Sequence, residues 1–332
     1  MSLDIFNPTI SKVSEGLEGK TMLIYGGNSV GKTKQASRLS KPYYLGFEKG
    51  LNAISGVPYH YIKKWSEFKK LNKQFTGKTV KEARERFDTI IFDTVDIAAM
   101  YCRDYVANQH GVTTISEGNN GFGLWSEYAK EFWDEIDALT SVGYTVAFIG
   151  HTAHEKTDGD GDSVGQIIPR GDVRTMGVVR DLVDIVVYVK SNGVDEDGNV
   201  ILSTGYVRED TDNFFARSRY PHMPNVIDPF TAENLEEAII EGIRKEEEAG
   251  GNVVSFKDFK EQNTSKELDF DELKKEVISL GKQFHKEDRV NEFKDLLSDM
   301  FGVGTEVKDL LPKQVEAMTI FIADAKELLE SN

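Results

Sequence analysis

Residues 22–33 of the chain read Met-Leu-Ile-Tyr-Gly26-Gly-Asn-Ser-Val-Gly31-Lys32-Thr33. From Gly26 to Thr33 they match the pattern G-x-x-x-x-G-K-[ST], which is called the P-loop. An apolar strand pattern precedes the first glycine, and a helical pattern over residues 32–39 follows the last one. A Gly-rich turn without a ligand is the alternative interpretation, but such a turn would not require a strand before it and a helix after it. The stretch therefore predicts a nucleotide site at the start of an α/β fold.

Phosphate binding explains the residue types in this loop. Glycines let backbone N–H groups curl around phosphate oxygens, and the helix that follows adds partial positive charge. We expect Lys32 to bridge the β- and γ-phosphates and Thr33 to place its hydroxyl on Mg²⁺, so the expected ligand is ATP with Mg²⁺. The expected nucleotide-binding residues are Gly26, Gly27, Asn28, Ser29, Val30, Gly31, Lys32, Thr33 and Lys34.

A second ligand for the metal is expected at the end of another buried strand. Ile90-Ile-Phe-Asp93 supplies a carboxylate at such a position. Asp93 would hold a magnesium-bound water. An aspartate in a plain turn is the alternative, and the P-loop upstream favours the metal role.

The first 230 residues alternate apolar runs with helical patterns, which is typical of a parallel sheet with crossover helices. Strands are expected at residues 21–25, 43–46, 59–62, 89–93, 145–150 and 185–190. Helices are expected at residues 32–39, 66–75, 95–108 and 124–141. Turn residues at 192–193 and 195–198 predict a hairpin that joins residues 185–190 to 200–207 at the sheet edge.

The last third of the chain differs in composition. Residues 245–268 are polar and contain Gly250-Gly251, so we expect a linker between a core, residues 1–244, and a module, residues 269–332. Apolar residues beyond the linker fall at helical spacing. Gly281, Gly302 and Pro312 are expected to separate three short helices.

Composition excludes several classes of protein. The 332 residues contain no stretch that approaches the roughly 20 apolar residues of a membrane span, and the first residues do not form a secretory signal. A single cysteine, Cys102, excludes an internal disulfide and a Cys-rich metal site. These features predict a cytoplasmic protein without a membrane partner.

The charge is acidic and uneven. The chain has 40 basic and 56 acidic residues, and residues 231–332 alone have 14 and 25, a net of −11. DNA binding would therefore need a local basic patch. Residues 63–86, with nine Lys/Arg against three Glu, form one candidate, although a solvated helix face is the more ordinary interpretation.

Two strand ends resemble those of RecA-like ATPases. Gly46-Phe-Glu48 ends the strand after the P-loop helix, where that family places its catalytic glutamate, so Glu48 is the expected base; a surface Glu is the alternative. Ile149-Gly-His151 ends the fourth strand, where the family carries a polar γ-phosphate sensor, often Gln. His151 departs from Gln but can donate a hydrogen bond to phosphate. A DNA-facing loop follows in the family, and here it would span residues 153–174 with the cations Lys156, Arg170 and Arg174.

A late element, Ala216-Arg217-Ser-Arg219, is similar to the Lys/Arg-x-Lys/Arg element of RecA-like and DnaB-like ATPases. In those proteins the cations reach the nucleotide of the next subunit. Arg217 and Arg219 would then stabilise transition-state charge and make hydrolysis depend on assembly. A structural ion pair is the alternative.

Taken in order, these motifs resemble the phage-encoded RecA-core ATPases, which include the fourth class of Sak-like single-strand annealing proteins. The resemblance covers about residues 10–240. It implies a RecA-like P-loop NTPase fold with a mainly parallel sheet, ATP hydrolysis, and ATP-dependent binding and annealing of single-stranded DNA. It also implies a homo-oligomer, ring or filament, in the cytoplasm of a bacterial host.

The acidic C-terminal module is not part of that core. We expect it to be an interaction module for a single-stranded DNA-binding protein or another replication protein. Two other functions stay open. One is an ATPase that loads or remodels a replication protein without binding DNA; the other is a small-molecule kinase, although residues 153–174 have few of the cations that a kinase lid needs.

Overall fold

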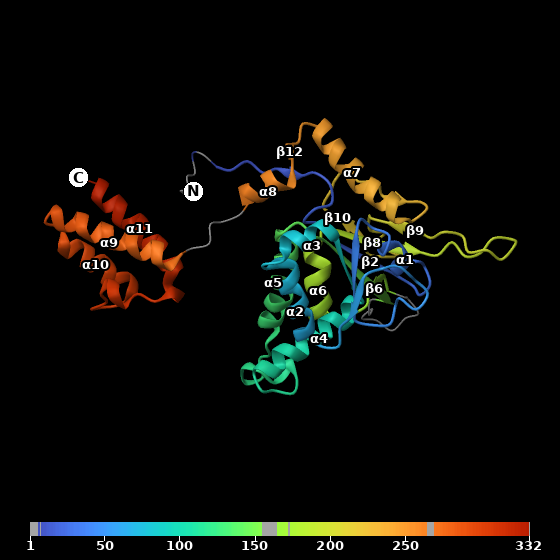
Figure 1. The fold of residues 1–332 in the computed structure, drawn as a ribbon, viewed down its shortest axis with the longest axis horizontal. Coiled ribbons are helices and arrows are strands. Elements are labelled where there is room, and N and C mark those ends of the chain that lie inside the picture. The colour runs from blue at the N-terminus through green and yellow to red at the C-terminus, as the bar shows by residue number, and fades with distance from the viewer. Residues whose placement is uncertain (1–5, 7, 155–164, 172, 264–268, 332) are drawn as a thin grey trace. The chain divides into compact units, whose positions relative to one another are not determined.

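The computed structural model describes residue 6 and residues 8–154, 165–171, 173–263 and 269–331 (Figure 1). The chain forms two compact units, Met1–Gln262 and Asn263–Asn332. No helix among the described residues combines the length and the apolar character that crossing a membrane requires.

A ten-stranded sheet forms the centre of the first unit. Its strands are β2 (Thr21–Gly26), β3 (Pro42–Gly46), β4 (Tyr59–Tyr61), β5 (Thr89–Asp93), β6 (Thr145–His154), β7 (Ile167–Pro169), β8 (Ile185–Lys190), β9 (Thr204–Tyr206), β10 (Arg217–Ser218) and β11 (Val226–Ile227). The main path runs β11-β9-β8-β2-β6-β5-β3-β4, with β7 on β6 and β10 on β8. The strands from β8 to β4 along this path are parallel, which confirms the predicted α/β class with a mainly parallel sheet.

Helices cover both faces of the sheet (Figure 1). One face packs against α2 (Trp65–Thr76), α3 (Val80–Arg86), α4 (Val95–Gln109), α5 (Trp125–Ser141) and α6 (Val173–Leu182), and the other against α1 (Lys32–Ala36) and α7 (Ala232–Glu248). Successive strand side chains point to opposite faces, so Leu23 and Tyr25 join the first core while Met22 and Ile24 join the second. A strand buried on both faces must be apolar throughout, and β2 and β5 are recognisable in the sequence for this reason.

The linker expected over residues 245–268 needs correction. The helix α7 continues to Glu248, β12 (Val253–Val254) pairs with β1 (Val13–Ser14), and α8 (Phe256–Asn263) follows. The ring of Phe256 lies against Gly19, so this stretch is fastened to the first unit. A few apolar residues in a polar run are enough to dock it. Residues 264–268 lie outside the described part of the chain.

The second unit is a helical bundle with its own core, as predicted for the C-terminal part. Its helices are α9 (Phe270–Lys286), α10 (Val290–Phe301) and α11 (Val315–Glu330), with Phe284, Phe293 and Phe321 packed between them. Gly281 does not separate two helices, contrary to expectation. It lies inside α9, where a Cβ atom would stand 3.2 Å from the Phe293 ring, so glycine permits the close packing of α10. The first break comes after Lys286 instead.

Candidate nucleotide site

The P-loop connects β2 to α1 at the carboxyl edge of the sheet. Gly26 ends β2, Gly31 has the left-handed φ of 90° that favours glycine, and Lys32 begins α1. The helix has five residues, fewer than the expected 32–39. A short helix has a small dipole, so the loop N–H groups and Lys32 must supply most of the attraction for phosphate.

The Lys32 side chain is folded back into this loop. Lys32 is 7% exposed, and its Nζ donates hydrogen bonds to the carbonyl oxygens of Gly26 at 3.0 Å and Gly27 at 2.6 Å. Burial lowers the pKa of Lys32, while the carboxylates of Asp93 and Glu48 act in the opposite direction. The loop therefore holds a cation at the place where a phosphate would arrive.

Asp93 lies beside Thr33 at the carboxyl end of β5. Its Oδ2 accepts hydrogen bonds from Thr33 Oγ1 at 2.7 Å and from the Tyr44 hydroxyl at 2.9 Å. Burial raises the pKa of Asp93. The hydrogen bonds from Thr33 and Tyr44, and the charges of Lys32 and His151, counteract part of this rise. The two residues expected to bind the metal are thus in direct contact.

Oxygen atoms near Asp93 fit a magnesium site. Asp93 Oδ1, Thr94 Oγ1 and Asp96 Oδ1 are buried, and among the described residues they have no hydrogen-bond partner. Buried polar atoms of this kind call for a ligand, a water or an ion. Hard oxygen atoms are the ligands that Mg²⁺ prefers, so Thr33 and Asp93 would hold it, directly or through water. When bound, Mg²⁺ would neutralise charge on the phosphates.

Glu48 and His151 lie close to each other beside Asp93. The N–H groups of Phe47 and Glu48 both donate to the Asp93 carbonyl oxygen, at 2.7 and 3.1 Å. Glu48 Oε1 lies 3.6 Å from Nε2 of His151, which stands opposite Gly26 in the β2–β6 register. The carboxyl ends of four parallel strands thus gather the P-loop, Asp93, Glu48 and His151 along one edge.

An open pocket of about 790 Å³ adjoins the loop. Its walls are residues 29–34 of the P-loop, Ser37 and Arg38 beyond α1, and residues 50 and 53–57. The volume falls within the range of small-molecule and cofactor sites. The pocket gives a nucleotide room to extend from the loop.

The structure does not bring Arg217 and Arg219 to this edge. Arg217 pairs with Val186 near the start of β8, and its guanidinium donates to the carbonyl oxygens of Asp181 and Val183 at 2.7 and 2.6 Å. Arg219 lies 3.4 Å from the carboxylate of Asp184. Both arginines are therefore at the amino end of the parallel strands in their own chain. Their action on the nucleotide of another copy stays a prediction.

Part of the segment expected to be a DNA loop is regular structure. The strand β6 continues to His154 and pairs with β7, so the loop is shorter than residues 153–174. Arg170 forms an ion pair with Asp96, and the guanidinium of Arg174 lies 4.8 Å from the Trp125 ring centroid. Lys156 is outside the described residues.

Tyr44 is the site residue that sequence reasoning missed. It lies in the apolar run Tyr43-Tyr44-Leu45, which predicts only a buried strand. The alternation of a strand places Tyr44 on the face opposite to Tyr43, but nothing in the sequence indicates its bond to Asp93. Its hydroxyl fixes the carboxylate from the side opposite to the P-loop strand.

A comparison with known families agrees with this geometry. A family profile described as an AAA domain matches residues 18–220, more than half of the chain. The chain belongs to this AAA domain family. The matched region spans the P-loop, and an AAA domain is a domain of the P-loop ATPase class.

A comparison with individual proteins adds a full-length relative. The chain is 46% identical over 330 residues to the SPbeta prophage-derived uncharacterized protein YorG of Bacillus subtilis (strain 168), and the alignment covers 99% of each chain. The similarity therefore extends beyond the AAA domain through the C-terminal helical unit.

Replacing Tyr44 by Phe tests the metal site. We expect the Mg²⁺ concentration that half-saturates ATP binding to rise about tenfold, as is typical when a partner of a metal ligand is removed. The measurement is ATP titration by calorimetry over a series of Mg²⁺ concentrations. Tyr43→Phe removes the same atom from the neighbouring residue, whose hydroxyl bonds His60 instead, and serves as the control. An equal Mg²⁺ requirement in both variants would contradict a role for Tyr44 at Asp93.

Proposed function

We propose that the chain binds ATP with Mg²⁺ and hydrolyses it, using Glu48 as the general base. The observation that carries this proposal is the meeting of Lys32, Thr33, Asp93 and Glu48 at one sheet edge. Lys32 provides charge for the β- and γ-phosphates, and Thr33 and Asp93 provide oxygen atoms for the metal. Glu48 has a partly exposed carboxylate that can take a proton from an attacking water.

His151 has a positioning role in this proposal. Its Nε2 faces Glu48 at 3.6 Å, and its strand lies between the strands of the P-loop and of Asp93. From this place the imidazole can donate to a phosphate oxygen or to Glu48. Either contact would make the orientation of the base sensitive to the nucleotide.

We further propose that the core is RecA-like and that hydrolysis is coupled to single-stranded DNA during phage recombination or replication. Support comes from the resemblance to phage-encoded RecA-core ATPases and from the full-length relative, which is prophage-derived. The helical unit would bind a single-stranded DNA-binding protein or another replication protein, because its sequence carries an excess of acidic residues and would repel DNA phosphates.

Single-stranded DNA should raise the ATPase rate several-fold if this coupling exists. The measurement is phosphate release with and without an oligonucleotide, next to a gel shift at two salt concentrations. DNA binding through phosphate contacts must weaken as salt rises. An ATPase rate that DNA leaves unchanged, with no gel shift at low salt, would instead favour an ATPase that loads or remodels a replication protein.

A further inference from the structure

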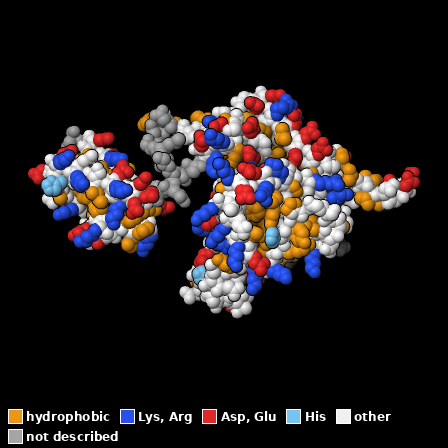
Figure 2. Space-filling model, in the orientation of Figure 1, with side chains coloured by type: hydrophobic (Ala, Val, Ile, Leu, Met, Phe, Trp, Pro, Cys, Tyr) orange, Lys and Arg blue, Asp and Glu red, His pale blue; other side chains and the backbone are white. Residues whose placement is uncertain are grey.

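A projecting hairpin joins β8 to β9. Residues 191–203, here called the arm, extend beyond the sheet (Figure 1). The arm exposes an apolar strip, with Val200 74% and Val194 61% exposed, together with Ile201 and Leu202. Its tip carries three consecutive acidic residues, 195–197. In Figure 2 the arm shows apolar side chains along its length and acidic side chains at its end.

The arm has a defined conformation. Val194 and Val200 form an antiparallel bridge, and the Asp195 carboxylate accepts hydrogen bonds from the N–H groups of Asp197 and Asn199. At the base, the Ser203 hydroxyl donates to the carbonyl oxygen of Val30 in the P-loop at 2.9 Å. An exposed apolar strip with a defined conformation is typical of a binding surface, because preorganisation reduces the conformational entropy lost on docking.

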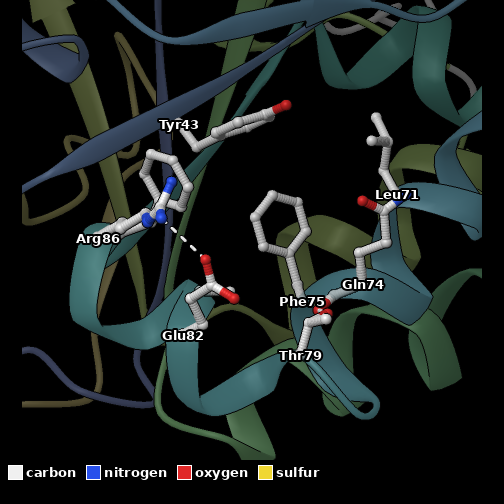
Figure 3. Close-up of a pocket in the computed structure, with 9 residues that line it drawn as sticks. Tyr43, Leu71, Gln74, Phe75, Thr79, Glu82 and Arg86 are labelled. Carbon is white, nitrogen blue, oxygen red and sulfur yellow. Dashed lines mark hydrogen bonds and ion pairs between the residues drawn. The ribbon is translucent and has the colours of Figure 1, made fainter.

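A small aromatic pocket lies on another part of the first unit, between α2, α3 and β3. It has a volume of about 270 Å³ and an apolar floor (Figure 3). The lining residues are Tyr43, Leu71, Gln74, Phe75, Thr79, Glu82, Ala83, Arg86 and Phe87. The rings of Phe75 and Phe87 each meet Tyr43 at 76° with centroids 4.9 Å apart. Because these rings pack edge to face against one another, the pocket suits aliphatic side chains better than a stacked base.

The two helices that wall this pocket carry several basic residues. Lys70, Lys73, Lys78 and Lys81 come from α2, α3 and the turn between them, and all four are exposed. None of the four has an ion-pair partner in the part of the chain that the structure describes. These lysines belong to the patch 63–86, whose other cations are partly paired, as Arg86 is with Glu82 (Figure 3). The pocket therefore has an apolar floor and lies in a segment, residues 63–86, with an excess of positive charge; its own charged lining residues, Glu82 and Arg86, pair with each other.

The arm and the pocket complement each other but cannot meet in one chain. The strands β8, β2, β6 and β5 separate β9, at the base of the arm, from β3, at the pocket. With about 4.8 Å between neighbouring strands, this is a distance of roughly 24 Å across the sheet, and the arm extends further beyond β9. A contact between them requires a second molecule.

We propose that copies of this chain join head to tail, with the arm of one copy docked in the aromatic pocket of the next. The aliphatic strip fills the pocket, and the acidic tip lies against the basic segment of residues 63–86. The proposal names an interface for the homo-oligomer that the resemblance to RecA-core ATPases implies. Because the two surfaces differ, each joined pair keeps one arm and one pocket free, so the contact continues into a ring or a filament.

Charge-reversed variants test this interface. The pocket variant carries Lys73→Glu with Lys78→Glu, and the arm variant carries Val200→Asp with Leu202→Asp; all four positions are exposed, so folding should tolerate them. We expect the wild type to form multimers with ATP and Mg²⁺ in light scattering, and each variant to fall to the 37.3 kDa monomer. Mixed in equal amounts, the two variants should give dimers and nothing larger, because each pair has one intact contact. Lys275→Glu with Lys294→Glu on the helical unit is the matched control and should keep the wild-type mass.

Cross-linking tests contact between the two surfaces directly. Ile201→Cys combined with Gln74→Cys should give a ladder of multimers with a short bismaleimide, while Ile201→Cys with Asp134→Cys on α5 should not. The native Cys102 is fully buried and will not contribute. A wild type that stays monomeric, variants that keep the wild-type mass, a mixture without dimers, or equal ladders from both cysteine pairs would each overturn the proposal.

Two further measurements distinguish this interface from a DNA site and from a failure of the proposed function. If the lysine reversals weaken single-stranded DNA binding and leave the mass unchanged, the basic segment 63–86 is a DNA site and the proposal is overturned. ATP binding by calorimetry is measured on the same samples. A wild type that assembles as described but does not bind ATP would contradict the proposed function and leave the interface standing.

Discussion

Lys32→Ala should weaken ATP binding by about 10²-fold or more, because the site loses charge-assisted hydrogen bonds to two phosphate groups. The Lys32 ammonium is the cation held inside the P-loop, on the carbonyl oxygens of Gly26 and Gly27. Burial already disfavours its charge, so the neighbouring carboxylates and the phosphates must stabilise it. Titration calorimetry with ATP and Mg²⁺ measures the effect.

A matched control for this variant is Lys41→Ala. Lys41 is an exposed lysine just before β3, and it pairs with Asp88 at 3.6 Å, away from the P-loop. The Lys41 variant should bind ATP as the wild type does. Equal affinity in the Lys32 variant and the wild type would remove the P-loop assignment.

Glu48→Gln should bind ATP normally and hydrolyse it at least about 10²-fold more slowly, as is typical when a general base is lost. The substitution keeps the shape of the side chain, and the backbone hydrogen bonds to Asp93 stay. Binding is read by calorimetry and turnover by phosphate release, so the two effects are separated. Glu237→Gln on the exposed side of α7 removes an equal charge and should change neither ATP binding nor turnover.

The outcome for Glu48 also decides between the neighbouring groups. Normal hydrolysis by Glu48→Gln, together with loss of hydrolysis in His151→Ala, would place the base on β6 instead of after β3. Loss of ATP binding by Glu48→Gln would show that Glu48 holds the nucleotide or the metal. Either result would contradict the proposed role of Glu48 as the general base.

The fold was largely predictable because its central strands are buried on both faces. Runs such as residues 21–25 and 89–93 must then be apolar throughout, and such runs stand out in a sequence. The P-loop was predictable because its residues are contiguous and each has one chemical purpose. The stretch 245–262 was not predictable, because Val253, Val254 and Phe256 are too few to stand out in a polar run and yet dock it on β1 and Gly19.

The site beyond the P-loop depends on strand order, which a sequence does not state. The order β2-β6-β5-β3 brings His151, Asp93 and Glu48 to the same edge as Lys32. Sequence reasoning found Asp93 from the metal ligand expected at the end of a buried strand, and Glu48 and His151 from a resemblance to RecA-like proteins. It could not see that Tyr44 bonds Asp93, or that Arg217 and Arg219 lie at the opposite end of β8, because both facts depend on register.

The hairpin after β8 illustrates the same limit. Its turn residues predicted a hairpin, and the antiparallel pairing of β8 with β9 confirms it, but the second strand is residues 204–206 instead of 200–207 and β11, not β9, forms the sheet edge. That Val194 and Val200 would be left exposed was not predictable, because an apolar run such as Val200-Ile201-Leu202 usually indicates a buried strand.

Phosphate release by the purified full-length chain in ATP and Mg²⁺ tests the central claim most directly, with Lys32→Ala and Glu48→Gln measured in parallel. The account predicts many turnovers per wild-type molecule, background release from both variants, and retained ATP binding only in the Glu48 variant. Release by the wild type that does not exceed that of Lys32→Ala, with or without single-stranded DNA, would contradict it.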